Sequence, residues 1–330
     1  MIPQSILVTG GAGFIGRWVV KELLAGGRAE HAFTPPAVVV LDNLENGRES
    51  NLDELRDDPH FSAFFQSDIK DRALINQLFA RYKFDLVLHL AAKINVQESI
   101  DDPVGVFESD VIGTFNLLEQ TRQTGGAFAF MSTCMVYAPS AQPSGIDEEH
   151  PTRCASPYAG AKLAAEHLVE SYHRAYGMRT VILRPFNTYG PFQKTTGEGG
   201  VVSIFLSREM ESRKLEIFGD GTQTRDLLYV EDCADFTVRA ALSDAAVGNL
   251  INAGTGRDVT INELAALICR DPSRIVHVPH HHPQAEIQKL LANAGRAGQL
   301  LNWKPTVSIS EGLEKTRAWI KATMKVDRNG

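Results

Sequence analysis

The sequence has few cysteines, no long apolar run and no basic cluster. Its four cysteines lie far apart without a Cys-x-x-Cys pair, a spacing unlike that of a disulfide framework or a zinc site. No apolar run approaches the roughly 20 residues of a membrane-spanning helix. The N-terminus also lacks the basic-then-apolar pattern of a secretory signal. We therefore expect a cytoplasmic protein with reduced thiols and no membrane partner.

Nucleic acid and metal are unexpected partners as well. Lys and Arg number 33 against 40 Asp and Glu, a formal charge of −7, and no five basic residues stand together. Such a chain has neither the net positive charge nor the basic cluster that binds a nucleic-acid phosphate backbone. The run His280–His282, with His277 just before it, has ligand chemistry. Adjacent side chains point in different directions, however, and no second ligand cluster is near, so we expect no metal.

The remaining composition is that of a folded α/β protein. Apolar residues make up 43% of the chain, close to the globular average, and 330 residues suit one large or two intimate domains. The first half alternates short apolar runs with longer segments of helical spacing. This alternation predicts a Rossmann-like, doubly wound parallel sheet, followed by a smaller C-terminal α/β substrate domain.

The patterning also predicts where each element lies. Strands are predicted at 6–9, 38–41, 61–65, 86–90, 128–132 and 180–183, and helices at 14–25, 72–82, 104–122 and 158–176. After residue 187 the alternation weakens, and the chain is expected to return to the sheet near 227–230 and 250–252. The predicted domains are therefore 1–186 plus about 227–254 for the dinucleotide, and 187–226 plus 255–330 for the substrate.

A glycine-rich turn after the first strand predicts a dinucleotide site. Gly10, Gly13 and Gly16 stand between a strand and a helix, where missing side chains allow a tight turn and a close approach of backbone N–H groups to a pyrophosphate. Asp42 ends the second strand, where a carboxylate accepts hydrogen bonds from an adenosine ribose. Because that carboxylate repels a 2′-phosphate, NAD is predicted rather than NADP. Asp68 is either an adenine contact, directly or through the Ile69 amide, or a helix N-cap.

Tyr158 and Lys162 lie four residues apart, and therefore on one face of the predicted helix. A phenol with a pKa of about 10 is a poor base, and lowering that pKa by three units requires about 4 kcal/mol. A lysine and an oxidised nicotinamide, both cationic, are able to supply this stabilisation. Tyr158 is then the base that removes a substrate hydroxyl proton. Taken alone, the pattern is common on helices.

The rest of the chain gives this pair its context. The sequence resembles the extended short-chain dehydrogenase/reductase superfamily, specifically its NAD-dependent nucleotide-sugar epimerases and dehydratases. The motifs that carry the resemblance are TGGAGFIG at Thr9, LDNL at Leu41, HLAA at His89, STCMVY at Ser132, SPYAGAK at Ser156, RPFNTYGP at Arg184, GDGTQTRDLLYVED at Gly219, NAGTG at Asn252 and LNWKP at Leu301.

The resemblance implies a role for particular residues. Thr133, which precedes Tyr137, corresponds to the hydroxyl that binds the sugar C4 hydroxyl, and Tyr158 and Lys162 to the base and its partner. Cys134 is a further catalytic candidate. The implied NAD contacts are Gly10, Gly13, Phe14, Ile15, Gly16, Asp42, Asn43, Asp68, Ile69, Leu90, Ala91, Ala92, Lys93, Tyr158 and Lys162. The implied contacts to a nucleotide-diphosphate sugar are Lys93, Thr133, Asn187, Val201, Arg225 and Glu286.

The residues after Thr133 bear on which reaction follows oxidation at C4. A 4,6-dehydratase needs further proton-transfer groups, and relatives commonly have Asp-Glu there, whereas this chain has Cys134-Met135. An epimerase needs no such group, because the 4-keto sugar rotates and is reduced on its other face. The preferred prediction is a nucleotide-sugar 4-epimerase. A 4,6- or 5,6-dehydratase with Cys134 near the leaving group remains open, as does a non-catalytic dinucleotide-binding regulator.

Departures from the family pattern are also visible. Asp110 stands where relatives usually have Asn, and His282-Pro283-Gln284-Ala285-Glu286 replaces a segment that carries an arginine for the second phosphate. Glu98, after HLAA, is a candidate helper group or a solvated carboxylate. The helices 104–122 and 158–176 are apolar on more than one face. In the family the matching pair forms a dimer interface, so a homodimer is expected.

Overall fold

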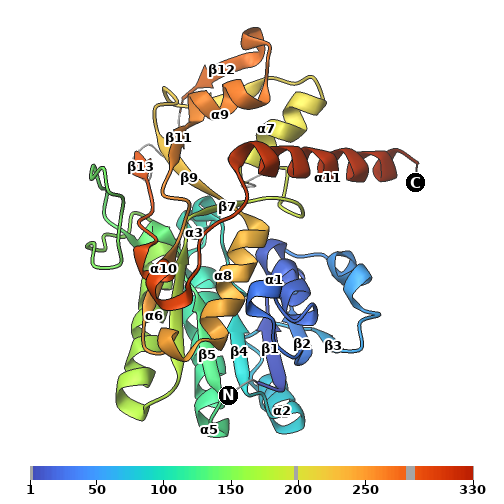
Figure 1. The fold of residues 1–330 in the computed structure, drawn as a ribbon, viewed down its shortest axis with the longest axis vertical. Helices are drawn as coiled ribbons and strands as arrows, with labels where there is room; N and C mark the ends of the chain where they lie inside the picture. Colours follow the sequence, from blue (N-terminus) through green and yellow to red (C-terminus); the bar gives the residue numbers. More distant parts are fainter. Residues whose placement is uncertain (1–2, 197–199, 280–286, 330) are drawn as a thin grey trace.

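The computed structural model describes residues 3–196, 200–279 and 287–329. Its larger part is built on a seven-stranded sheet in the order β10-β6-β5-β4-β1-β2-β3 (Figure 1). Every neighbouring pair in this sheet is parallel, as a doubly wound fold requires. The strands are β1 Ser5–Thr9, β2 Ala37–Asp42, β3 Phe61–Gln66, β4 Leu86–His89, β5 Ala127–Met131, β6 Thr180–Pro185 and β10 Leu250–Ala253.

Helices cover both faces of this sheet because its strands are apolar on both sides. Ile6 and Val8 pack into the core under α1 and α8, while Leu7 between them packs into the core under α2, α5 and α6. The helices are α1 Phe14–Leu24, α8 Val230–Leu242, α2 Arg72–Tyr82, α5 Thr114–Thr124 and α6 Pro157–Tyr176. The predicted fold class and the predicted strands of the first half are confirmed.

The helix predicted over 104–122 is interrupted. The chain forms α3 Val96–Asp101 and α4 Pro103–Phe107, and then the π-helical turn η3 Glu108–Gly113, before α5 begins. Apolar spacing does not distinguish a π turn from the α-helix around it. Because π-helical turns are frequent at functional sites, this segment is a candidate for a functional role.

A smaller part lies above the carboxyl ends of the large sheet (Figure 1). Strands β11-β9-β13, with β7 against β9, form one sheet, and β12 and β8 form another. The strands are β7 Asn187–Tyr189, β8 Leu215–Phe218, β9 Thr224–Tyr229, β11 Asp258–Thr260, β12 Ile275–Val278 and β13 Lys289–Leu290. The helices are α7 Val201–Met210, α9 Ile261–Ile268, α10 Gly295–Leu301 and α11 Ile309–Asn329.

The predicted return of the chain to the large sheet is half right. Residues 250–253 do form its edge strand β10, but residues 227–229 belong to β9 in the smaller sheet. Both segments are short apolar runs, and the sequence does not distinguish them. Residues 227–229 belong to the smaller sheet because their strand, β9, pairs with β7, β11 and β13. The return therefore begins with α8, which packs against α1. The domain limits themselves stay a prediction.

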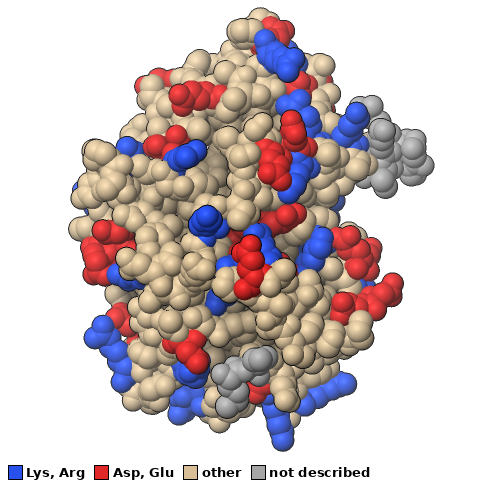
Figure 2. Space-filling model, in the orientation of Figure 1, with Lys and Arg blue, Asp and Glu red and all other residues tan. Residues whose placement is uncertain are grey.

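Short 3-10 turns connect several of these elements. They are η1 Ala29–His31, η2 Glu49–Leu55, η4 Cys134–Val136, η5 Asp244–Ala246 and η6 Pro272–Arg274. On the face shown in Figure 2, basic and acidic side chains are interspersed. Across the described ranges, no helix combines the length and apolarity needed to cross a membrane.

Candidate functional site

A cavity of about 470 Å³ opens at the carboxyl ends of the large sheet. Gly10 follows β1, Asp42 ends β2, Leu90 follows β4, Met131 ends β5 and Pro185 ends β6, and all of them line it. Parallel α/β sheets bind their ligands at this edge, because the loops there diverge and leave a crevice. The ends of five strands and the loops that follow them are therefore arranged around one pocket.

The glycine turn after β1 forms one wall. Gly10 has φ +73°, and a Cβ there would lie 2.7 Å from the backbone nitrogen of Ala91. A Cβ on Gly16 would lie 2.0 Å from the carbonyl oxygen of Gly10. Both positions therefore require glycine. No side chain caps the N-terminus of α1 at Gly13, which leaves backbone N–H groups facing the cavity for a pyrophosphate.

The carboxylate of Asp42 closes the far end of this turn. It accepts from Ala12 N at 3.0 Å and from Leu44 N at 2.8 Å, and it lines the cavity. Burial raises its pKa, against these backbone hydrogen bonds, which favour the charged form. The turn, the open helix terminus and this carboxylate together fit the pyrophosphate and adenosine ribose of NAD.

Asp68 lies on the same wall and is not the N-cap of α2. That cap is Asp71, whose carboxylate accepts from Leu74 N at 3.0 Å. Asp68 instead lines the cavity beside Ile69. Its Oδ2 accepts from the Asn43 amide at 3.3 Å. The structure thus favours the ligand-contact alternative for Asp68 over the capping one.

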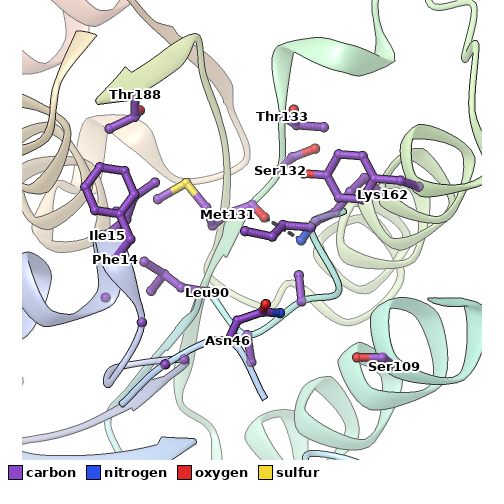
Figure 3. Close-up of a pocket in the computed structure, with 18 of the residues that line it drawn as sticks. Phe14, Ile15, Asn46, Leu90, Ser109, Met131, Ser132, Thr133, Lys162 and Thr188 are labelled. Atoms are coloured by element: carbon purple, nitrogen blue, oxygen red, sulfur yellow. Dashed lines mark hydrogen bonds between the residues drawn. The ribbon is translucent and has the colours of Figure 1, made fainter. Parts of the chain in front are cut away.

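The opposite wall carries the predicted catalytic residues. In Figure 3, Thr133 and Lys162 lie across the pocket from Phe14 and Ile15. Tyr158, which is buried on the first turn of α6, lines the same wall as Thr133. One turn later, Lys162 donates from Nζ to the Met131 carbonyl at 3.0 Å. The spacing of four residues has brought phenol and ammonium to the same wall.

The protonation of Tyr158 differs from the expectation. Burial first, and then the charge of Asp110, raise the pKa of its phenol well above the ordinary value, against the influence of the Thr133 side chain. Lys162 is itself buried, which lowers the pKa of its ammonium, while the charges of Asp110 and Glu166 raise it. The protein's own groups thus do not lower the Tyr158 pKa as predicted. The positive charge of a bound nicotinamide would favour the ionised phenol.

A buried polar cluster holds this wall in place. Ser132 donates to the carboxylate of Glu166, one turn after Lys162, and Arg184 on β6 donates to both oxygens of the same carboxylate. The side chains of Glu166 and Arg184 are each 4% exposed. The Arg184 guanidinium also lies 4.5 Å from the ring centre of Tyr137. The cluster ties α6, β5 and β6 together directly behind Thr133.

Cys134 follows Thr133 in the cavity wall. Its thiol is buried, and burial raises its pKa to about 12, against the nearby charge of Arg225. The thiol is therefore protonated at neutral pH. It can hold a proton for transfer, but it is not a thiolate nucleophile.

The predicted substrate contacts Asn187 and Arg225 line the cavity on the side of the smaller part. Asn187 Oδ1 is buried without a hydrogen-bond partner among the described residues, so this acceptor is available to a donor group of a ligand. Arg225 donates to the carbonyls of Thr224 and Ile287, both at 2.8 Å. These bonds orient its guanidinium at the pocket.

Other predicted contacts lie away from the cavity or cannot be placed. The ammonium of Lys93 pairs with Glu45 at 2.8 Å and with Glu98 at 2.7 Å, and Lys93 is not among the lining residues. Hydrogen bonds, first to Glu45 and then to Glu98, raise its pKa. Glu98 is thus an ion-pair partner. Val201 begins α7 outside the lining set, and Glu286, like His280–His282, lies outside the described residues.

Several lining residues were not predicted from the sequence. Two of them, Asn46 and Gln193, are in loops, whereas Ser109 is in the π turn, Met131 ends β5 and Thr188 is in β7. Figure 3 shows Asn46 and Ser109 at the rim farthest from Thr133. Their residue types carry no signal, and only Met131, at the end of β5, could have been inferred from its position at a strand end. Within residues 3–196, 200–279 and 287–329, no group of three or more His, Cys, Asp or Glu is arranged to hold a metal ion.

Comparisons with known proteins agree with this geometry. The family model described as "NAD dependent epimerase/dehydratase family" matches residues 6–254. The solved structure of Pal from Bacillus thuringiensis is 55% identical, with a TM-score of 0.93 over 97% of this chain and 99% of that one.

Two curated relatives differ in the reaction that they are named for. The UDP-glucose 4-epimerase of Mycolicibacterium smegmatis is 37% identical over 94% of this chain and 96% of its own length. The dTDP-glucose 4,6-dehydratase of Neisseria meningitidis serogroup B is 31% identical over 96% of this chain and 93% of its own length.

Proposed function

The chain belongs to the NAD dependent epimerase/dehydratase family, and on that premise we propose that it is a nucleotide-sugar 4-epimerase. It is an enzyme whose cofactor is NAD. The observation that carries the proposal is the wall formed by Thr133, Tyr158 and Lys162 opposite the glycine turn. When bound, NAD accepts the hydrogen and electron pair that leave C4 of the sugar and later returns them.

The chain's own residues handle the proton and the position of the sugar. Thr133 and Tyr158 bind the C4 hydroxyl between them, and Tyr158 takes its proton as the carbon is oxidised. Lys162, held by its hydrogen bond to the Met131 carbonyl, places a positive charge in the same buried wall. Electrostatic interactions are stronger there than in water, because the effective dielectric constant is lower. Asn187 and Arg225 bind the diphosphate side, because an amide and a guanidinium donate to phosphate oxygens. Roles for Lys93, Val201 and Glu286 in sugar binding stay predictions.

The residues beside Thr133 favour epimerisation. Neither Cys134 nor Met135 is a carboxyl group, so the position next to Thr133 offers no acid of ordinary strength to expel a C6 hydroxyl. An epimerase needs none, because the ketone only has to turn over and be reduced on its other face. Loss of a proton at C5 is then not part of the reaction.

The experiment is to incubate the NAD-loaded enzyme with uridine- and thymidine-diphosphate hexoses in D₂O and to analyse the products by mass and NMR. A product of unchanged mass, inverted at C4 and free of solvent deuterium, is expected. Loss of one water, or deuterium at C5, would contradict the proposal. In parallel, Tyr158→Phe should retain NAD binding and lower turnover by at least about 10²-fold.

Dehydration is the second candidate, because Cys134 lies in the cavity wall with a thiol that stays protonated. Such a thiol can donate a proton to a leaving hydroxyl next to C5. Cys134→Ala separates the two reactions, because it abolishes dehydration and leaves a 4-epimerase active. Cys233→Ala is the matched control, since that thiol is equally buried but lies on α8 outside the cavity.

A second copy of this chain is the proposed partner in solution. Large apolar side chains are exposed along the segment from α4 to α5: Val104 is 66% exposed, Phe107 51%, Ile112 42% and Phe115 36%. A homodimer through this segment and α6 covers them. Phe107→Glu should convert the dimer to a monomer in light scattering. A wild-type monomer would contradict the assembly. The cytoplasm remains the predicted location.

A further inference from the structure

Asp110 is a buried carboxylate directly behind the catalytic wall. It lies in the π-helical turn Glu108–Gly113 and is 1% exposed. Its neighbour Ser109 lines the cavity, but Asp110 does not. A side chain in this place acts on a ligand only through other residues. A buried charge without a structural partner is costly, so its presence beside a reaction centre calls for a function.

The two oxygens of Asp110 are used differently. Oδ1 accepts from the backbone N–H of Lys93 at 2.8 Å and so fixes the loop after β4. Oδ2 is buried without a hydrogen-bond partner in the part of the chain that the structure describes. An asparagine would make the bond to Lys93 equally well. The second oxygen, and the negative charge, are therefore not needed to hold the loop.

A buried hydrogen-bond chain fixes the backbone of Asp110. Its carbonyl accepts from the Thr114 hydroxyl at 2.5 Å, and Thr114 Oγ1 bonds His89 Nε2 at 2.9 Å. On the other side of the ring, His89 Nδ1 bonds Thr9 Oγ1 at 2.7 Å. Burial lowers the pKa of His89 far below its usual range, so the ring is neutral. The π turn is thereby anchored to the ends of β1 and β4.

The charges that face Asp110 come from several elements. The π turn packs directly on α6, where Val111, next to Asp110, shares a buried apolar cluster with Ala161, next to Lys162. The titratable groups of α6 that act on Asp110 are Tyr158 and Lys162, and Glu166 also acts on Lys162. From the loop after β4, the N–H and ammonium of Lys93 favour the ionised carboxyl, as does Ser109 within the turn. Burial outweighs them and raises the Asp110 pKa. The π turn, α6 and the loop after β4 therefore meet around one titrating group.

These contacts have opposite effects on the two catalytic side chains. A negative Asp110 stabilises the buried ammonium of Lys162. The same charge opposes a second negative charge on Tyr158. An asparagine in this position would do neither. With asparagine the shape of the site is unchanged, whereas the pH dependence of Tyr158 and Lys162 is altered.

We propose that Asp110 is a positioning residue whose charge holds Lys162 and sets the pH at which Tyr158 becomes a base. This inference rests on the proposed oxidation at C4, because Tyr158 has to lose its proton there. The enzyme accordingly starts the reaction at a higher pH than a variant with a neutral side chain at residue 110. No part of the effect requires Asp110 to touch the sugar or NAD.

The test compares the NAD-loaded wild type with Asp110→Asn, which keeps the acceptor for Lys93 and removes only the charge. The protein is labelled with ¹³C at the tyrosine Cζ atoms, and the Tyr158 signal among the seven tyrosines is assigned by its loss in Tyr158→Phe. The signal is then followed through a pH titration. Glu108→Gln, an exposed carboxylate in the same turn, is the matched control. Asp110→Ser gives a second neutral variant should the amide not be accommodated.

In Asp110→Asn the Tyr158 midpoint should fall by about one pH unit, and it should not move in Glu108→Gln. The pH dependence of NAD reduction after mixing with a nucleotide sugar should shift in the same direction. An unchanged midpoint, or an equal shift in both variants, would overturn the proposal. If none of the nucleotide sugars tested causes NAD reduction in the wild type, the proposed function fails. The titration still decides the role of Asp110.

Discussion

Replacing Glu166 by Gln tests whether the buried cluster behind Thr133 stabilises both the fold and the catalytic wall. The carboxylate accepts from Ser132 and twice from Arg184, and the side chains of Glu166 and Arg184 are each 4% exposed. A glutamine keeps one acceptor but turns its amide toward the guanidinium. It therefore leaves the Arg184 charge buried without a counter-ion.

The cost follows from this burial. Breaking a buried ion pair by removing one partner costs about 3 to 5 kcal/mol. With an unfolding entropy near 2 cal/mol/K for each of 330 residues, this corresponds to a decrease in melting temperature of about 4 to 7 °C. Turnover should fall as well, because Ser132 loses its acceptor next to Thr133.

Thermal unfolding followed by circular dichroism at one scan rate measures the effect. The matched control is Glu170→Gln on the next turn of α6, where the carboxylate is 44% exposed and pairs with Arg174, so that less than about 0.5 kcal/mol is expected. The double variant Glu166→Met with Arg184→Met removes both charges and should regain most of the lost stability. A Glu166→Gln protein as stable as the wild type, or a double variant less stable than the single one, would refute the reasoning.

Three further predictions concern the glycine turn, the thiol and the acid limit. Gly10→Ala combines φ +73° with a Cβ 2.7 Å from the Ala91 nitrogen, so it should lose about 2 kcal/mol or more and weaken NAD binding, as measured by unfolding and cofactor titration. Cys134, whose pKa burial raises to about 12, should resist iodoacetamide at neutral pH in the folded protein and react in urea; rapid labelling without urea would contradict its burial. Hydrogen bonding, first from Arg122, lowers the Glu119 pKa from 4.5 to about 2, so its stabilisation is complete above pH 4.5 and lost as the pH falls to about 2. Glu119→Gln should flatten the melting-temperature curve in that window, and an unchanged slope would argue against the assignment.

The features that could be predicted from sequence are local along the chain. Gly10, Gly13 and Gly16 predict a tight strand-to-helix turn. This prediction succeeds because the turn depends only on the spacing and conformational freedom of neighbouring residues. The alternating strand–helix pattern predicts the parallel sheet for the same reason. Tyr158 and Lys162 follow from a helical period of 3.6 residues, which brings residues four apart to one face.

Features that depend on distant residues were missed or misplaced. The short run at 227–229 pairs with β7 rather than with the large sheet, and residues 224–226 of the same strand pair with β11 and β13. Strand pairing is not encoded in the run itself. Lys93 turns to Glu45, in the loop after β2, and to Glu98, on α3.

The electrostatics of the site illustrate the same division. Residue types predict Tyr158 as a base and Lys162 as its partner, but the direction of a pKa shift depends on burial and on every charge packed nearby. The π turn that brings Asp110 behind Tyr158 has the same apolar spacing as an α-helix. Chain-local chemistry thus specified the reacting groups, whereas long-range packing set their protonation, because solvent exclusion and charge proximity arise only once separate elements meet.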